Sequence, residues 1–409
     1  MFLNGLMEDA SWNTCKSLNQ IAIQTDKKFG VNISKQGVDY RFNDQAMEYM
    51  QMLIGEGLSN QVKQTIQGEW LDSFSRVLIK DSTKFDISEN LEGIFPGYHQ
   101  KGAFAAVSIQ YEFDIKSGTV NDLSIHPATR PDRTDAKETI ESVKKGDLII
   151  RDLGYSILDC FKKIRDKEAS FLSRLDPKTS VYDMGESGNW KELDYGKLYQ
   201  FMIKNGIMRM EKQVCIGKEL RLPVRMVIEV MPEEVISKRR RETNRRNRYM
   251  GCKTSDEYKD RSCFNIFITN VDEQILTAEA ISLVYRTRWM VELVFKNWKG
   301  VFGIDHLNPM KYQRLMCVLY MRLLMITICW EIFTLKRKQL FDQTGKLVSL
   351  IKCMKTLQEN CIFLKEILIN KCKGLSKWIR KISQILDNHH WLEKKKNKVG
   401  LAEILAIKA

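Results

Sequence analysis

The sequence contains few residues of the kinds that build zinc sites or disulfide frameworks. It has only five histidines, and its ten cysteines are scattered along the chain without a Cys-x-x-Cys pair. Neither a zinc site nor a disulfide framework is therefore indicated, and the cysteine usage is typical of reduced thiols in a cytosol. Internal repeats and low-complexity segments are also missing.

Long apolar runs are scarce as well. Residues 315–335 form the one run that resembles a membrane span, but Arg322 and Glu331 interrupt it. A fully buried helix accounts for this run more simply than a membrane span does. The first residues, MFLNGLMEDASWN, include acidic side chains and lack the basic and then apolar pattern of a signal peptide. We therefore expect no membrane partner.

The remaining composition is that of a folded protein with an excess of basic residues. The chain has 409 residues, of which 44% are hydrophobic and 28% are charged, so it can form two or three domains with a substantial core. Its net charge of +14 and pI of about 9.2 favour an anionic partner. Nucleic acid is the first candidate and an acidic membrane surface is the second.

Residues 285–299, YRTRWMVELVFKNWK, are predicted to form one amphipathic helix. At 100° per residue, four polar residues fall within about 60° of one another: Tyr285, Arg288, Glu292 and Lys299. Apolar residues fill the opposite arc and would face a core. A carboxylate flanked by an arginine and a lysine suits a divalent cation and phosphate oxygens. The alternative is a solvated helix face with ordinary ion pairs.

The spacing of these four residues also points to a family. They match Tyr-x2-Arg-x3-Glu-x6-Lys, the signature of bacterial insertion-sequence transposases of the DDE class. The chain resembles this family, more weakly, over roughly residues 70–335. The resemblance implies a DNA transposase that cleaves strands at transposon ends and transfers them into target DNA, which is cut-and-paste transposition.

Two aspartates follow predicted strands. Asp81 comes after residues 76–80, and Asp152 comes shortly after residues 147–150. Aspartate is also common in ordinary turns, so neither residue is diagnostic alone. Their neighbourhoods, Asp-Ser-Thr and Asp-x-Gly-Tyr, resemble those of the family's two catalytic aspartates and occur in the same order.

The predicted elements indicate the fold class. Strands are predicted at residues 76–80, 102–114, 119–126, 147–150 and 170–174, and helices at 133–145 and 156–167. This order predicts an α/β arrangement with a mixed sheet, and the resemblance implies the ribonuclease-H-like fold of this transposase class. Open α/β sheets place their chemistry at strand ends, where both aspartates are expected.

Five regions are predicted along the chain. They are a helical N-terminal DNA-binding region (1–70), the first part of a ribonuclease-H-like core (71–175), a β-rich insertion with a basic run (176–270), the second part of the core with the signature helix (271–335), and a helical basic C-terminal region (336–409). Helices at 17–29 and 34–42 are compatible with a helix-turn-helix that exposes Lys35, Gln36 and Tyr40, or with a plain helical hairpin.

The insertion is predicted to contain strands at residues 208–216, 220–231 and 264–270, and it carries the densest positive charge. Residues 237–249 include seven basic side chains: Lys238, Arg239, Arg240, Arg241, Arg245, Arg246 and Arg248. Such a run repels itself unless a polyanion meets it, so we predict contact with DNA phosphates. The alternative is a solvated helix face. Trp190 is a weaker candidate for stacking a displaced base, since tryptophan is more often a core residue.

The resemblance also implies roles for the site residues. Three carboxylates would be catalytic and would bind two Mg²⁺ ions, for which Mn²⁺ can substitute: Asp81, Asp152 and Glu292. Arg288 and Lys299 would hold DNA phosphates, and Tyr285 would support the strand near the cut. The expected partner is double-stranded DNA, both terminal inverted repeats and target DNA, bound by a homodimer in the bacterial cytoplasm at the nucleoid. The alternatives are a metal-dependent nuclease of the same fold and a non-enzymatic or defective transposase-derived DNA-binding protein.

Overall fold

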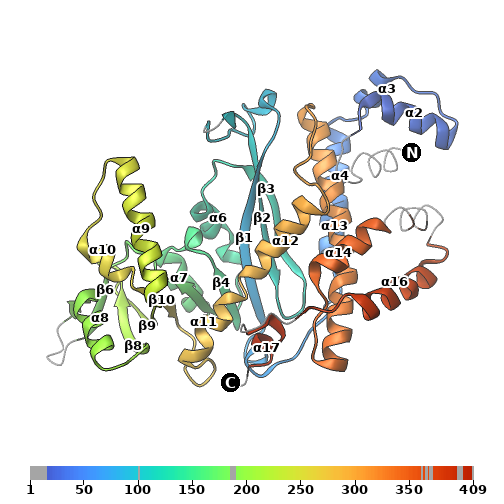
Figure 1. Cartoon of the computed structure of the whole chain (residues 1–409). Helices are drawn as coiled ribbons and strands as arrows, with labels where there is room; N and C mark the ends of the chain where they lie inside the picture. Colours follow the sequence, from blue (N-terminus) through green and yellow to red (C-terminus); the bar gives the residue numbers. More distant parts are fainter. Residues whose placement is uncertain are drawn as a thin grey trace. The chain divides into compact units, whose positions relative to one another are not determined.

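The structure of the protein is a computed structural model of the whole chain (Figure 1). It describes residues 16–99, 102–184, 190–360, 363, 367, 372–393 and 399–407. The MFLNGLMEDASWN start of the predicted N-terminal region lies outside the described residues, as do parts of the predicted C-terminal region.

The chain divides into two compact units, and each unit is built from several chain segments. Unit 1 contains Met1–Gln67, Lys80–Arg130 and Trp289–Glu403, and unit 2 contains Gly68–Ile79, Pro131–Arg288 and Ile404–Ala409. One crossing between the units falls between Arg288 and Trp289. The residues of the Tyr-Arg-Glu-Lys signature are therefore divided between the two units.

The described part of unit 1 begins with three helices: α2 (Leu18–Phe29), α3 (Lys35–Tyr40) and α4 (Asp44–Ser59). Each starts at a side-chain cap, because Ser17, Ser34 and Asn43 accept hydrogen bonds from backbone N–H groups of the first turn. The predicted helices at 17–29 and 34–42 are confirmed, although α3 has only six residues. Its predicted DNA-reading side chains are exposed: Lys35, Gln36 and Tyr40. Both interpretations of this helix pair remain predictions.

The centre of unit 1 contains strands β2 (Ala106–Asp114) and β3 (Val120–Pro127), which pair antiparallel, and the 33-residue helix α13 (Tyr312–Thr344). Helices α4 and α13 lie side by side (Figure 1). By length and composition α13 could cross a membrane, but most of its apolar window is buried inside the protein. Its Trp330 indole donates to the carbonyl of Gly118. The predicted core helix at 315–335 is therefore confirmed.

Among the described residues, unit 1 also contains α12 (Trp289–Gly300), α14 (Leu350–Glu359) and α16 (Leu375–His389) from the second half of the chain. Helix α12 packs on β2 through aromatic side chains. The ring of Trp298 lies 4.9 Å from that of Tyr111, in an edge-to-face arrangement. Such contacts add to the burial of apolar surface, so they fix which face of α12 is turned to the core.

Unit 2 is built on two parallel strands, β4 (Asp147–Arg151) and β5 (Ser170–Arg174). They are covered by α6 (Asp132–Glu138), a 3-10 helix (Thr139–Ser142) and α7 (Leu158–Asp166), whose apolar residues form one core with the strands. The short helix α5 (Glu69–Asp72) is held by Trp70, whose indole donates to the carbonyl of Ile404 in α17 (Leu401–Leu405). The prediction for 170–174 is confirmed at both ends.

The predicted insertion continues unit 2 with both strands and helices. Its strands are β6 (Val181–Met184), β7 (Trp190–Glu192), β8 (Arg209–Ile216), β9 (Leu222–Val230) and β10 (Phe264–Thr269). Its helices are α8 (Tyr195–Lys204), α9 (Glu233–Met250) and α10 (Asp256–Arg261), and α11 (Ala278–Arg286) follows β10. The three predicted strands are confirmed, but the three helices show that the insertion is mixed α/β.

The strands are hydrogen-bonded in the order β3-β2-β1-β4-β5-β10-β9-β8-β6-β7. Strand β1 (Arg76–Asp86) belongs to both units, because the chain crosses after Ile79. The sheet is mixed, since β4 and β5 are parallel whereas β10 is antiparallel to both β5 and β9. The α/β class and the ribonuclease-H-like order of the first five strands agree with the sequence-based prediction.

Strand β1 is longer than the predicted strand at 76–80. It runs on to Asp86, so Asp81 lies in the middle of the strand and not at its end. The strand continues because burial alternates after Asp81: Thr83 and Phe85 are buried, while Lys84 is half-buried and Asp86 is exposed. The predicted end of the strand before Asp81 was therefore wrong.

Candidate active site

The predicted single helix at 285–299 is two helices. Helix α11 ends at Arg286, and α12 begins at Trp289. Between them, Thr287 is buried, and its hydroxyl donates to the carbonyl of Val284 at 2.7 Å. The backbone N–H groups of Thr287 and Arg288 bond three residues back, which tightens the last turn. The Thr287 hydroxyl shares the Val284 carbonyl with the Thr287 backbone N–H, at the point where the α-helical ladder stops.

This break divides the signature between two half-sites. Tyr285 and Arg288 lie in unit 2 with Asp152, whereas Glu292 and Lys299 lie in unit 1 with Asp81. Within either unit, no three histidine, cysteine, aspartate or glutamate side chains among the described residues lie close enough together to hold a metal ion. A shared metal site for the three carboxylates therefore stays a prediction.

The half-site in unit 2 brings together Asp152, Tyr285 and Arg288. Asp152 directly follows β4, and its carbonyl accepts the N–H of Tyr155 in a single 3-10 turn. The Tyr285 hydroxyl donates to Asp152 Oδ1 over 3.5 Å, and Arg288 Nε lies 3.9 Å from the same oxygen. Both distances are long for hydrogen bonds. The carboxylate side chain is 45% exposed, so it faces solvent as well as these two groups.

Tyr285 is held between the sheet and this carboxylate. Its ring packs on Phe267 of β10, with ring centroids 5.4 Å apart. Burial, and to a smaller extent the Asp152 carboxylate, raise the pKa of Tyr285 to about 12. Tyr285 therefore keeps its proton at neutral pH and acts as a hydrogen-bond donor.

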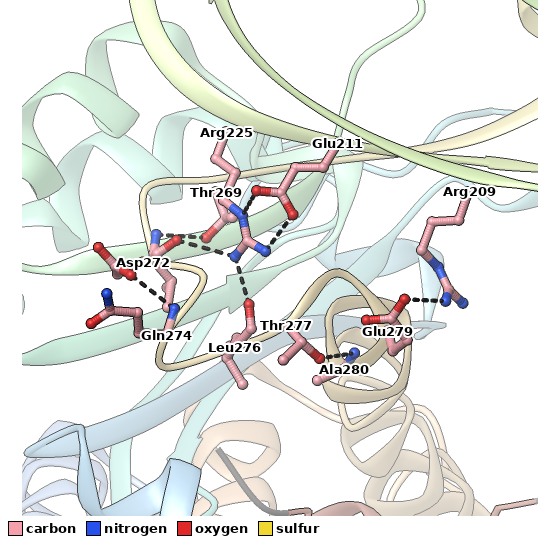
Figure 2. Close-up of polar contacts among 11 residues, drawn as sticks. Arg209, Glu211, Arg225, Thr269, Asp272, Gln274, Leu276, Thr277, Glu279 and Ala280 are labelled. Carbon is pink, nitrogen blue, oxygen red and sulfur yellow. Dashed lines mark hydrogen bonds and ion pairs between the residues drawn. The ribbon is translucent and has the colours of Figure 1, made fainter. Parts of the chain in front are cut away.

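The loop that leads into α11 is fixed from β9, as Figure 2 shows. The guanidinium of Arg225 donates to both carboxylate oxygens of Glu211 at 2.7 Å, and to the carbonyls of Val271 and Leu276 at 3.3 and 2.6 Å. Thr277 then caps α11 by accepting the N–H of Ala280. Arg225 thus ties the start of α11 to the predicted insertion, which was not expected from the sequence.

The half-site in unit 1 contains Asp81, Glu292 and Lys299. Asp81 is half-buried, and its Oδ1 accepts the N–H of Ser82 at 2.8 Å. Glu292 is half-buried in the first turn of α12, where a carboxylate interacts favourably with the helix dipole. Lys299 donates to the carbonyl of Lys84 at 2.7 Å, three residues after Asp81 on β1. The carboxyl-terminal end of α12 is therefore attached to the strand that carries Asp81.

The basic run lies on α9, which is stabilised at both ends. Glu233 and Glu234 occupy its first turn, and Gly251 ends it in a left-handed conformation with φ of 64°. Six of its seven basic side chains are exposed: Lys238, Arg240, Arg241, Arg245, Arg246 and Arg248. This exposure is compatible with DNA contact and with a solvated face, so the predicted role stays a prediction.

Arg239 differs from the other six basic residues. Its guanidinium donates to the carbonyls of Ser262 and Phe264 at 3.0 Å each, and to the side-chain oxygen of Asn265 at 2.8 Å. Burial lowers the pKa of Arg239 from its ordinary value. This side chain holds α9 against β10, and a role in DNA contact remains only a prediction for it. Trp190, on β7, is 42% exposed, so its predicted stacking role is likewise untested.

Comparison with known proteins places the chain in a family. Residues 72–328, more than half of the chain, match the family described as Transposase DDE domain. The chain belongs to this family and is a DDE transposase. Membership implies a DNA partner and dependence on a divalent metal ion.

Named relatives agree with this class. The transposase for insertion sequence element IS231B of Bacillus thuringiensis subsp. berliner is 28% identical and covers 91% of this chain and 81% of the relative. The transposase for insertion sequence element IS1151 of Clostridium perfringens is 26% identical and covers 83% of this chain and 75% of the relative. Among solved structures, the piggyBac transposase synaptic complex with hairpin DNA has 12% identity and a TM-score of 0.46, and the match covers 97% of this chain and 77% of that chain.

Proposed function

We propose that this protein cuts DNA at the ends of a bacterial insertion sequence and joins the freed ends to target DNA by cut-and-paste transposition. The observation that carries the proposal is the family match over residues 72–328. That range contains all three carboxylates predicted to be catalytic: Asp81, Asp152 and Glu292. The transposase names of the relatives support the same activity.

The positions of the two aspartates support a common role. The first residues of β1 and β4, Arg76 and Asp147, form an ion pair of 2.5 Å. Asp81 and Asp152 each come five residues after these partners. Strands β1 and β4 are neighbours in the sheet, so the two aspartates are carried by adjacent strands. We therefore propose that both aspartates bind the same metal ions, with Glu292 as the third ligand.

The donor set fits Mg²⁺, which prefers a few carboxylates and keeps several waters. Oδ2 of Asp152 has no hydrogen-bond partner among the described residues, while Oδ1 faces Tyr285 and Arg288 only at long distance. The carboxylate therefore keeps an open oxygen for a cation. We propose Mg²⁺, with Mn²⁺ as a substitute. When bound, the ions would activate the attacking oxygen and neutralise charge on the scissile phosphate.

The other signature residues are proposed to hold DNA. Arg288 presents a planar fork that suits phosphate oxygens. Lys299 uses one N–H for the carbonyl of Lys84, so its ammonium has further donors for a phosphate. Tyr285 supplies a neutral hydroxyl beside Asp152. These groups would position the strand at the cut without taking part in proton transfer.

The exposed basic residues of α9 are proposed to contact the backbone of double-stranded DNA, both at the terminal inverted repeats and at the target. Transposition joins two ends, so a homodimer on DNA is part of the proposal. The protein would act in the bacterial cytoplasm at the nucleoid, without a membrane partner.

Cleavage by carboxylate variants tests the proposal. The substrate is a labelled duplex that carries the DNA flanking this reading frame, with Mg²⁺ or Mn²⁺ added. Asp81→Asn, Asp152→Asn and Glu292→Gln should each lower strand cleavage by at least about 10²-fold and leave DNA binding intact. Asp159→Asn is the control, because Asp159 is an exposed carboxylate seven residues after Asp152.

Three other results of this assay would contradict the proposal, each in a different way. Full cleavage by the Glu292 variant contradicts the assignment of the third ligand. Cut products without joined products identify a nuclease that lacks strand transfer. Tight DNA binding without cleavage at any Mg²⁺ or Mn²⁺ concentration identifies a non-enzymatic or defective transposase-derived DNA-binding protein.

A further inference from the structure

Unit 2 contains an open cavity of about 430 Å³ that is lined by residues of β5, α9, α10 and β10. Four arginines contribute to its walls: Arg174, Arg239, Arg246 and Arg261. Glu242 is the one carboxylate in the lining. The cavity therefore has a strong excess of positive charge.

Arg261 is fixed in the wall by neutral groups. Its guanidinium is buried and donates to the carbonyls of Leu175, Asp176, Pro177 and Thr179. Four carbonyl acceptors satisfy its N–H groups but do not cancel its charge. Its orientation is consequently set before any ligand arrives.

Arg174 and Arg239 converge on a single neutral acceptor. The side-chain oxygen of Asn265 accepts from Arg239 at 2.8 Å and from Arg174 at 3.3 Å. Burial lowers the pKa of Arg239, and the charge of Arg174 adds to this effect. Two half-buried guanidinium groups around an amide oxygen repel each other, and a bound anion would offset that cost.

Arg246 is the member of the group whose guanidinium is not held by any described residue. It is exposed on α9 and has no hydrogen bond or ion pair with any described residue. A guanidinium fork matches two oxygens of a phosphate, and it can close over an anion that the fixed arginines attract. The pattern of three held arginines and one free arginine is that of a phosphate site.

The cavity is connected to the Asp152 half-site through the sheet. Arg174, the last residue of β5, pairs with Phe267 of β10, and the ring of Tyr285 packs on Phe267. The charge of Arg174 also acts on the Tyr285 hydroxyl and lowers its pKa slightly against the effect of burial. Arg174, which lines the cavity, is thus linked to Tyr285 through the single residue Phe267.

We propose that the cavity binds one backbone phosphate of the DNA strand that enters the Asp152 half-site, and that Arg246 closes on this phosphate. The inference rests on the proposed transposase function for the identity of the ligand. The site itself is defined by Arg174, Arg239 and Arg246 around the cavity.

Dinucleotide binding to the full chain tests the site without requiring cleavage. The probes are d(TpT), its neutral methylphosphonate analogue and inorganic phosphate, titrated at low ionic strength, where charge interactions are least screened. Arg246→Gln should weaken d(TpT) binding about tenfold, the loss expected for one charge-assisted hydrogen bond. The neutral analogue should bind the wild-type chain and the Arg246→Gln variant with equal affinity, because it has no phosphate charge for Arg246 to contact. Lys253→Gln is the control, because Lys253 is an exposed basic residue shortly after α9 that neither lines the cavity nor belongs to the residues proposed to contact DNA.

Equal weakening by the two variants overturns the proposal, since the effect would then be general charge loss. Binding of inorganic phosphate without binding of d(TpT) overturns the DNA assignment. The phosphate site and the proposed function can fail independently. If the chain binds d(TpT) through Arg246 but cuts no duplex DNA, the site is supported and the transposase activity is contradicted. If the chain cuts duplex DNA but its binding of d(TpT) does not depend on Arg246, only the phosphate site is contradicted.

Discussion

Replacing Arg225 by Met tests how the Asp152 half-site is positioned. Arg225 is 4% exposed and joins β9 to the loop before α11 (Figure 2). The variant removes the guanidinium but keeps an unbranched side chain of similar length. It leaves the Glu211 carboxylate and the carbonyls of Val271 and Leu276 without this donor.

The size of the effect follows from the burial of both partners. Removing one partner of a buried ion pair costs about 3–5 kcal/mol, because the other charge stays buried. The Glu211 side chain is 24% exposed, so solvent recovers part of this loss and we expect about 3 kcal/mol. Arg209 provides the matched control. It is 33% exposed and pairs with Glu229 and Glu279, and loss of such a partly solvated pair costs about 1 kcal/mol or less.

Two measurements check this prediction. Urea unfolding of Arg225→Met and Arg209→Met gives the two free energies of unfolding. Hydrogen exchange of the backbone amides at 271–280 then shows whether the loss is local, and exchange there should be faster in Arg225→Met only. If the Arg225 variant costs no more than the Arg209 variant and its amides exchange as in wild type, the loop is held by something else.

Three further predictions concern the basic helix and Tyr285. Replacing Arg240, Arg241 and Arg245 by Gln together should reduce the slope of log K for DNA against log salt by up to about 2.7, and an unchanged slope would count against phosphate contact. Arg239→Gln should instead lower the free energy of unfolding by roughly 1–3 kcal/mol in urea, because three protein acceptors lose their donor. Tyr285 ionises near pH 10 in the unfolded chain and at about 12 in the folded one, so stability should fall as pH rises between these values. In Tyr285→Phe that part of the fall should disappear, and an identical pH dependence in both proteins would refute the assignment.

Elements whose pattern is local could be predicted from the sequence. The strand at 170–174 is a short apolar run between charged residues, and β5 occupies the same residues. The apolar run at 315–335 predicted a core helix, and α13 contains it. In both cases the side chains that define the element are also those that it buries, so no distant partner was needed.

Features that depend on a distant or competing hydrogen bond could not be predicted. The sequence of 285–299 gives no sign of the break, because it contains neither glycine nor proline. The helix stops where the backbone N–H groups of Thr287 and Arg288 bond to the carbonyls of Val284 and Tyr285, and this choice is visible only in the structure. Likewise, Arg239 looks like its six basic neighbours in the sequence, and its acceptor Asn265 lies 26 residues further on.

The proposed metal ligands of unit 1 lie where the chain crosses between the units. The chain leaves unit 2 at Arg288, four residues before Glu292, and a span of four residues reaches at most about 14 Å. A second crossing follows Ile79, two residues before Asp81, so Asp81 lies at most about 7 Å from Ile79 of unit 2. Short covalent links cost little entropy to close, so ligands placed beside them can be drawn to a common cation without ordering a long loop. Asp81 and Glu292, the two proposed ligands of unit 1, thus each lie only a few residues along the chain from a segment of unit 2.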